Sequence, residues 1–254
     1  MVLEPVFTRA EVVLIYDRMD LTPVETTARA MDGGELLPNW EVSSLPTRLV
    51  LFSRSGSSIV VVDPRRTHIQ TRYFAEFTKP ANADLRRRNM LEKLKALYQL
   101  LQASSFSPLF LGLIANIRVP TDSQQRAGEL KKQLHQAPIS QHLRLNDQNW
   151  HDFLLRFSTE MDDDYFVTTQ ISWYEERVMS VFSGETAEVQ LRDWEAPVES
   201  SGIDIRIDMN NKRGLIKGRR KWSLEDFNWL VEAFHSRIPM YLNHALGVLH
   251  LGEI

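Results

Sequence analysis

A basic, glycine-containing segment near the C-terminus holds the residues best suited to bind a charged partner. It reads Lys-Arg-Gly-Leu-Ile-Lys-Gly-Arg-Arg-Lys from position 212 to position 221, and a tryptophan follows it. Clustered cations release counterions when they bind a polyanion, and an aromatic ring can stack on an exposed base. Glycine lets a loop approach another backbone closely. We therefore expect binding of a nucleic acid or an acidic partner by Lys212, Arg213, Lys217, Arg219, Arg220, Lys221 and Trp222. The alternative is a solvated loop whose charge is balanced by acidic neighbours.

Three consecutive arginines, Arg86, Arg87 and Arg88, form a second basic group. They fall in the first turn of a helix expected to begin at Asp84, where cations oppose the positive end of the helix dipole. Docking to a negative surface would compensate for that cost. A second copy of the chain offers such a surface at Glu160, Asp162, Asp163 and Asp164. The alternative is that the three side chains extend into water.

Paired carboxylates are weaker candidates for catalysis or for metal binding. Asp204 and Asp208 face the same side of an expected strand, but that spacing separates them by roughly 13 Å. Arg206 lies between them as an internal counterion, and metal sites usually need several converging ligands. We therefore expect these residues to form a structural ladder of charges with neighbouring strands.

Composition excludes several classes of site. The 254-residue chain contains no cysteine, which excludes disulfides, thiol nucleophiles and iron–sulfur clusters. The seven histidines lack the spacing of a zinc-binding helix, and no glycine-rich phosphate loop or nucleophile elbow occurs. The N-terminus does not look like a secretory signal, and the apolar stretch 108–115 is too short to span a bilayer. We expect a cytoplasmic protein with no cofactor, no bound metal and no membrane partner.

Hydrophobic patterns define the elements of the first half. Alternation with β-branched residues predicts strands over 8–19, 48–52, 58–62, 67–74 and 109–119. The polar residues 53–57 indicate a hairpin. Leucines at helical spacing predict a helix from Asp84, and Thr121-Asp122 would cap another. Residues 22–44 are expected to form a loop with one helical turn.

In the second half the same reasoning predicts a helix over 147–157. Strands over 165–174 and 177–182 are expected to pair around Glu175-Glu176. From Ile203 to Met209 apolar and charged residues alternate, so one face should be buried. Ser223 and Asp226 form a capping-box pattern at the start of a long final helix. Pro239 should kink or interrupt that helix near His235.

The order of these segments resembles a family of sporadically distributed bacterial α+β proteins of unknown function. The stretch Gly112–Pro120 is similar to the family's apolar Gly-Leu-Arg-Tyr-Ile-Asn strand, with Ile114-Ala115 in place of Arg-Tyr. Residues 203–208 resemble its aspartate-bearing strand, and residues 230–241 its C-terminal helix with a His and a Phe. The resemblance implies a two-part α+β fold and supplies no catalytic residues.

We therefore expect an α+β fold of two similar antiparallel-sheet units, each packed with helices. Residues 1–137 would form the first unit, and residues 138–254 the second, with its long terminal helix. The expected function is that of a non-catalytic interaction protein that recognises a macromolecule, most simply another protein or its own copy in a dimer. Two alternatives remain: a nucleic-acid-binding protein that uses residues 212–221, and a metal-dependent hydrolase.

Overall fold

A computed structural model describes most of the chain. The described residues are 4–31, 40–53, 57–104, 106, 108–121, 127–130, 154–162, 164–177, 198–219 and 222–248. The strands are β1 (Val6–Tyr16), β2 (Trp40–Leu45), β3 (Arg48–Ser53), β4 (Ser58–Asp63), β5 (Arg66–Arg72), β6 (Pro108–Pro120), β7 (Leu154–Met161), β8 (Tyr165–Arg177) and β9 (Val198–Asn210). The helices are α1 (Leu21–Met31), α2 (Ala83–Gln102), α5 (Lys212–Ile216) and α6 (Leu224–Val248), with 3-10 turns at Ala75–Thr78 and Pro80–Asn82.

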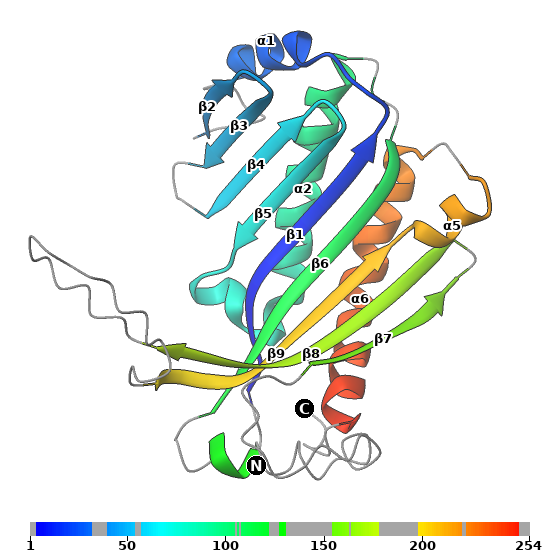
Figure 1. Cartoon of the computed structure of the whole chain (residues 1–254). Helices are drawn as coiled ribbons and strands as arrows, with labels where there is room; N and C mark the ends of the chain where they lie inside the picture. Colours follow the sequence, from blue (N-terminus) through cyan, green and yellow to red (C-terminus); the bar gives the residue numbers. More distant parts are fainter. Residues whose placement is uncertain are drawn as a thin grey trace, which may run out of the picture.

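All the described strands belong to one antiparallel sheet of nine strands, in the order β2-β3-β4-β5-β1-β6-β9-β8-β7 (Figure 1). The α+β class is therefore confirmed. In this order the six strands of the first half are contiguous, from β2 at one edge of the sheet to β6. The three strands of the second half follow, from β9 to β7 at the other edge. The two groups meet where β6 pairs with β9, for example Ala115 with Ile207. The two expected sheets are thus continuous with one another, and the stretch expected to join them, 137–147, lies outside the described residues.

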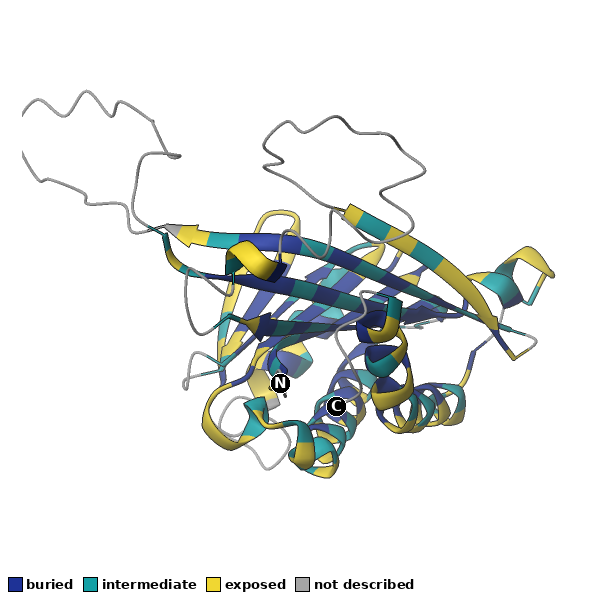
Figure 2. Cartoon of the chain, turned by 90° about the horizontal axis from the view of Figure 1, so that it is seen from below, coloured by how far each residue is buried: buried dark blue, intermediate teal, exposed yellow. Residues whose placement is uncertain are grey.

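The long helices α2 and α6 pack against the same face of this sheet (Figure 2). On α2, Lys93 contacts Thr71 of β5, and on α6 the His244 ring contacts Phe157 of β7. Thr71 and Phe157 lie in one register row across the sheet. The core fills the space between this face and the helices. Alternation in β9 is confirmed, because its inward side chains are at most 1% exposed: Ile203, Ile205, Ile207 and Met209.

Elements of the first half mostly follow the expected pattern, with one correction. The hairpin β3–β4, the meander into β5, the helix α2 and the strand β6 are confirmed. The expected loop over 22–44 is wrong, since α1 occupies Leu21–Met31. Its Val24 and Ala28 are one helical turn apart and fully buried, and the Asp20 carboxylate accepts a hydrogen bond from the Thr22 N–H at 3.0 Å. Tertiary packing and a cap therefore stabilise a helix that has too few large apolar residues to form a clear pattern in the sequence.

Two expectations for the second half are also wrong. Residues 154–157 belong to strand β7 and not to a helix, because they pair with β8 from Leu154 onward. No turn occurs at Glu175-Glu176, since β8 continues through both residues while pairing with Ser201 and Ser200 of β9. Of the helix expected after Thr121, the structure describes residues 127–130, which are helical. Residues 178–182 of the expected strand 177–182 and residues 147–153 of the expected helix 147–157 lie outside the described residues.

The capping box at the start of α6 is confirmed. The Ser223 N–H donates to the Asp226 carboxylate at 2.7 Å, and the Asp226 N–H donates to the Ser223 hydroxyl at 3.3 Å. The helix then continues through Pro239 without interruption. None of the described helices combines the length and apolarity needed to cross a membrane.

Candidate functional site

The basic segment folds against an acidic turn of its own chain. Residues 212–216 form the short helix α5, and Arg213 pairs with the Glu160 carboxylate at 2.5 Å. The same guanidinium donates to the backbone carbonyl of Asp162 at 2.9 Å. Gly214 is buried, and its N–H donates to the Asp164 carbonyl at 2.8 Å. The glycine therefore permits a close approach, but to the chain's own β7–β8 turn.

Arg219 and Trp222 complete this intramolecular contact. The Arg219 guanidinium binds the carboxylates of Asp164 and Asp226 at 2.6 and 2.5 Å and lies 4.0 Å from the centre of the Trp222 ring. That ring is 5% exposed and packs against Gly214 and Tyr165. The expectation that Trp222 stacks on a base is wrong, because its faces are covered.

The remaining basic residues of the segment are Lys212, Lys217, Arg220 and Lys221. Lys212 and Lys217 are exposed, while Arg220 and Lys221 lie outside the described residues. Since Arg213 and Arg219 are paired with acids, the alternative of a charge-balanced connection describes this segment better than a polyanion site.

The three arginines of α2 have three different environments. Arg86 is 2% exposed and donates to the backbone carbonyls of Phe77, Lys79 and Pro80 at 3.0, 2.5 and 3.1 Å. Its guanidinium also lies 3.7 Å from the centre of the Phe7 ring. Arg86 therefore fixes the turns before α2 against β1, and its expected docking role is wrong.

Arg87 and Arg88 lie further out. Arg87 pairs with Asp84 at 3.4 Å and with Glu232 at 2.6 Å, which links α2 to α6. Arg88 is exposed. The acids expected to receive these arginines from a second copy are already engaged within the chain, because Glu160 pairs with Arg213 and Asp162 approaches Arg237 at 3.8 Å. Asp163 lies outside the described residues.

A larger group of charged side chains gathers on the sheet face opposite α2 and α6, here called the outer face. Val12, Ile69 and Leu113 share one register row and are buried beneath the helices. Because side chains alternate between the two faces along a strand, the residues directly before and after each of these in the sequence point to the outer face. The polar side chains of the outer face include Arg72, Gln70 and His68 on β5, Arg9 and Glu11 on β1, Asn116 and Arg118 on β6, Asp204, Arg206 and Asp208 on β9, Thr168 and Gln170 on β8, and Arg156 on β7.

Four of these residues form a cross-strand arginine row: Arg72, Arg9, Arg206 and Arg156. Arg72 pairs directly with Arg9 in the register. Asn116 separates Arg9 from Arg206, and Gln170 separates Arg206 from Arg156. With neighbouring strands about 4.8 Å apart, the row extends roughly 24 Å across six strands.

The charges of this row are poorly neutralised. Arg9 approaches Glu11 at 3.1 Å. Within the described residues, the guanidinium groups of Arg72, Arg156 and Arg206 form no ion pair and no hydrogen bond. A polar hollow of about 230 Å³ lies at one end, lined by Arg156, Thr168, Gln170, Arg206 and Asp208. Its arginines therefore have their donors available for a ligand.

Glu11 anchors the centre of the outer face. Its carboxylate is hydrogen-bonded to Nε2 of His68 at 3.0 Å and accepts a hydrogen bond from the Asn116 amide at 3.2 Å. The hydrogen bond to His68 holds the pKa of Glu11 below its ordinary value, outweighing burial, and the nearby charges of Arg9 and Arg206 act in the same direction. Glu11 is therefore an anion that orients His68, Asn116 and Arg9.

The charge ladder expected between β9 and its neighbouring strands is present at Asp204, whereas the hydrogen bond of Asp208 lies within β9 itself. The Arg118 guanidinium binds Asp204 at 3.0 Å and also the Glu176 carboxylate, and it lies 4.4 Å from the centre of the Tyr174 ring. Asp208 accepts a hydrogen bond from the Asn210 amide at 3.0 Å. Arg206 was expected to serve as the counterion of these aspartates and does not. Among the described residues, no group of three or more His, Asp or Glu side chains could hold a metal ion.

Sequence comparisons find no relative with which the roles of these residues could be compared. Neither the models of known protein families nor the curated protein sequences match the chain. The resemblance to a bacterial α+β family therefore stays a prediction.

Sequence reasoning missed the arginine row. Each of its members is an outward residue of an alternating strand, which is the available local signal. The row arises only because the six neighbouring strands β5-β1-β6-β9-β8-β7 are in register, which brings together residues far apart in the chain.

Proposed function

We propose that the protein is a non-catalytic, cytoplasmic binding protein and that the arginine row on its outer face binds the phosphate backbone of a single-stranded nucleic acid. The observation that carries this proposal is the alignment of Arg72, Arg9, Arg206 and Arg156, three of which lack an ion pair within the described residues. The proposed nucleic-acid contact therefore lies on the sheet and replaces the contact expected at residues 212–221.

Arginine suits this role for two reasons. Its planar guanidinium presents several donors that match the geometry of a phosphate, and the group stays charged at any physiological pH. Like charges aligned along one row also repel one another, so a bound polyanion would remove an unfavourable interaction. The net charge of −3 does not oppose this, because binding depends on the local distribution of charge.

A single strand suits the outer face better than a duplex. Single-stranded RNA binds on open β-sheets, where backbone contacts combine with base stacking on exposed rings. Phe166 on β8 and Phe110 on β6 are outward residues that are partly exposed. Amide groups of Asn116 and Gln170 lie between the arginines and can bond base edges or sugars.

An acidic protein is the rival partner, and a binding assay separates the two. Fluorescence anisotropy would be measured with labelled 20-nucleotide RNA and DNA single strands, with unlabelled duplex DNA and polyglutamate as competitors, at several KCl concentrations. We expect salt-sensitive binding of a single strand, which polyglutamate displaces only in large excess. Binding of polyglutamate in preference to the single strands would overturn the proposal in favour of an acidic protein. Absence of binding to either single strand at low salt would also overturn it.

A further inference from the structure

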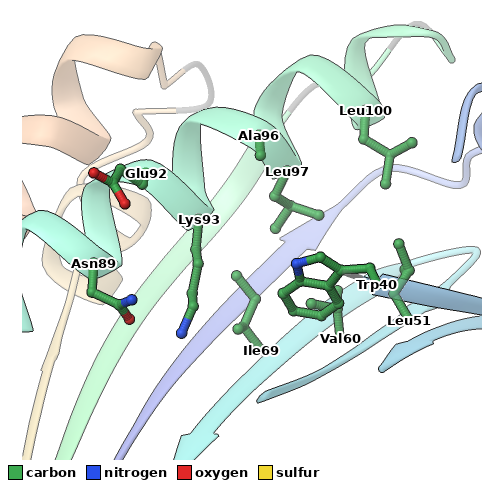
Figure 3. A pocket seen from close by; sticks show the side chains of 10 residues that line it. All are labelled: Trp40, Leu51, Val60, Ile69, Asn89, Glu92, Lys93, Ala96, Leu97 and Leu100. Atoms are coloured by element: carbon green, nitrogen blue, oxygen red, sulfur yellow. The ribbon is translucent and has the colours of Figure 1, made fainter. Parts of the chain in front are cut away.

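A pocket of about 200 Å³ lies between α2 and strands β2 to β5, on the opposite side of the sheet from the arginine row. Figure 3 shows its apolar wall and, at one end, Lys93 directed from the helix towards the sheet. The apolar lining consists of Trp40, Leu51, Val60, Ile69, Ala96, Leu97 and Leu100. Asn89, Glu92 and Lys93 complete the lining.

Lys93 is the unusual member of this lining. Its ammonium group donates to the hydroxyls of Ser58 and Thr71 at 2.8 and 3.1 Å, and these hydroxyls lie 3.1 Å from one another. An ammonium group has three N–H donors, so one remains. In the described part of the chain no carboxylate lies within ion-pair distance of Lys93, and the Glu92 carboxylate points away from it (Figure 3).

The surroundings therefore favour a negative charge next to Lys93. Burial lowers the pKa of Lys93 to about 8 and outweighs the opposite effect of the Glu92 charge, so the group is mostly protonated at neutral pH. Glu92 also lines the pocket but forms no ion pair with Lys93, which therefore lacks a direct counterion there. A ligand anion would supply that counterion and would accept the remaining N–H bond. Hydroxyl neighbours cannot do this, because they are neutral.

We propose that this pocket binds a small organic carboxylate with a compact apolar body. The carboxylate accepts a hydrogen bond from Nζ of Lys93, and the apolar body packs against Trp40, Ile69 and Leu97. The size agrees with this class, since an apolar cavity of about 150 Å³ is known to hold one benzene ring. The site is independent of nucleic-acid binding, because it lies on the other face of the sheet.

Isothermal titration calorimetry with benzoate and cyclohexanecarboxylate tests the site, with benzyl alcohol as the neutral counterpart. We expect saturable one-to-one binding of at least one acid, with benzyl alcohol at least tenfold weaker. Lys93→Met should weaken binding of the acid about tenfold or more, because it removes a charge-assisted hydrogen bond. Lys95→Met, which removes an exposed lysine from the same helix, should leave it unchanged. Raising the pH from 7 to 10 should also weaken binding, as Lys93 loses its proton.

The NMR signal of the Trp40 indole N–H provides a second measurement that needs no variant. It should shift with the same saturation curve as the calorimetric signal, since the ring lines the pocket. Acid binding that survives Lys93→Met, or that leaves the Trp40 signal unmoved, would overturn the proposal. No saturable binding of either acid at millimolar concentrations would overturn it as well.

Discussion

Arg206 of β9 and Arg156 of β7 project from one register row on either side of Gln170, and neither guanidinium has an ion pair within the described residues. Two cations about 10 Å apart repel one another weakly in water. A purely structural pair of residues would be expected to stabilise the sheet on which it lies. In the part of the chain that the structure describes, neither guanidinium does so through an ion pair or a hydrogen bond, which agrees with a role in binding.

The first prediction concerns the stability of this row. Arg206→Gln should leave the free energy of unfolding within about 0.5 kcal/mol of wild type, because no ion pair of the described structure is lost. Arg118→Gln is the matched control, since Arg118 pairs with Asp204 and Glu176 and its loss should destabilise by about 1 kcal/mol. Urea unfolding monitored by circular dichroism measures both. A larger loss for Arg206→Gln than for the control would indicate a structural residue.

A second prediction separates the basic segment from nucleic-acid binding. Arg219→Gln removes the ion pairs to Asp164 and Asp226, which are partly exposed and screened by solvent, so destabilisation should be about 1 kcal/mol and smaller at high salt. Affinity for a single strand should stay within twofold, because the guanidinium is already engaged within the chain. A tenfold loss of affinity in a variant that remains folded would return the binding site to residues 212–221.

The third prediction concerns the buried arginine of α2. Arg86→Met leaves the carbonyls of Phe77, Lys79 and Pro80 without their donor, and the expected cost is about 3 kcal/mol. Arg88→Met on the exposed side of the same helix should change stability by no more than about 0.5 kcal/mol. Thermal unfolding of the two variants provides the comparison, and equal stability would contradict the assigned role of Arg86.

Acid stability provides the fourth prediction. His235 is 7% exposed, and its N–H donates to the Val231 carbonyl at 2.9 Å. Burial lowers the pKa of His235 from 6.5 to about 4. Between these values the unfolded chain binds a proton that the folded protein does not, so stability falls as the pH decreases from about 6.5 to about 4.

The loss due to His235 should reach about 2 kcal/mol between pH 7 and pH 5. His235→Gln should abolish this part of the pH dependence while other titrating groups still contribute in both proteins. Urea unfolding at the two pH values measures the difference. An unchanged pH dependence in the variant would show that the pKa of His235 is not lowered in the folded protein.

Local patterns in the sequence predict most single elements of this fold. The alternation of Ile203 to Met209 identifies a strand with one buried face, and Ser223 with Asp226 identifies the start of α6, because both signals involve near neighbours in the chain. The α1 helix was not predicted, because its stability depends on burying Val24 and Ala28 against other elements. The continuity of the sheet was not predicted either, because it requires the pairing of β6 with β9, which are far apart in the sequence.

The candidate sites show the same limit. A run of arginines at 86–88 is indistinguishable in sequence from a solvated group, and only the fold brings three backbone carbonyls to Arg86. Conversely, the arginine row consists of isolated arginines, and in the sequence each of them is only an ordinary outward residue of its own strand. Cross-strand register creates both the charge density and the hollow beside Arg156 and Arg206.

The salt dependence of nucleic-acid binding tests the central claim most directly. The dissociation constant of a labelled 20-nucleotide single strand would be measured against KCl concentration for wild type, for Arg156→Gln/Arg206→Gln and for Arg88→Gln/Lys95→Gln. Each pair removes two positive charges, but the second pair lies on α2, on the other side of the sheet. We predict that the first pair weakens binding at least tenfold and reduces the logarithmic salt slope by about 1.4, or about 0.7 for each lost phosphate contact. Equal effects of the two pairs, or an unchanged slope in the first, would contradict binding at the arginine row.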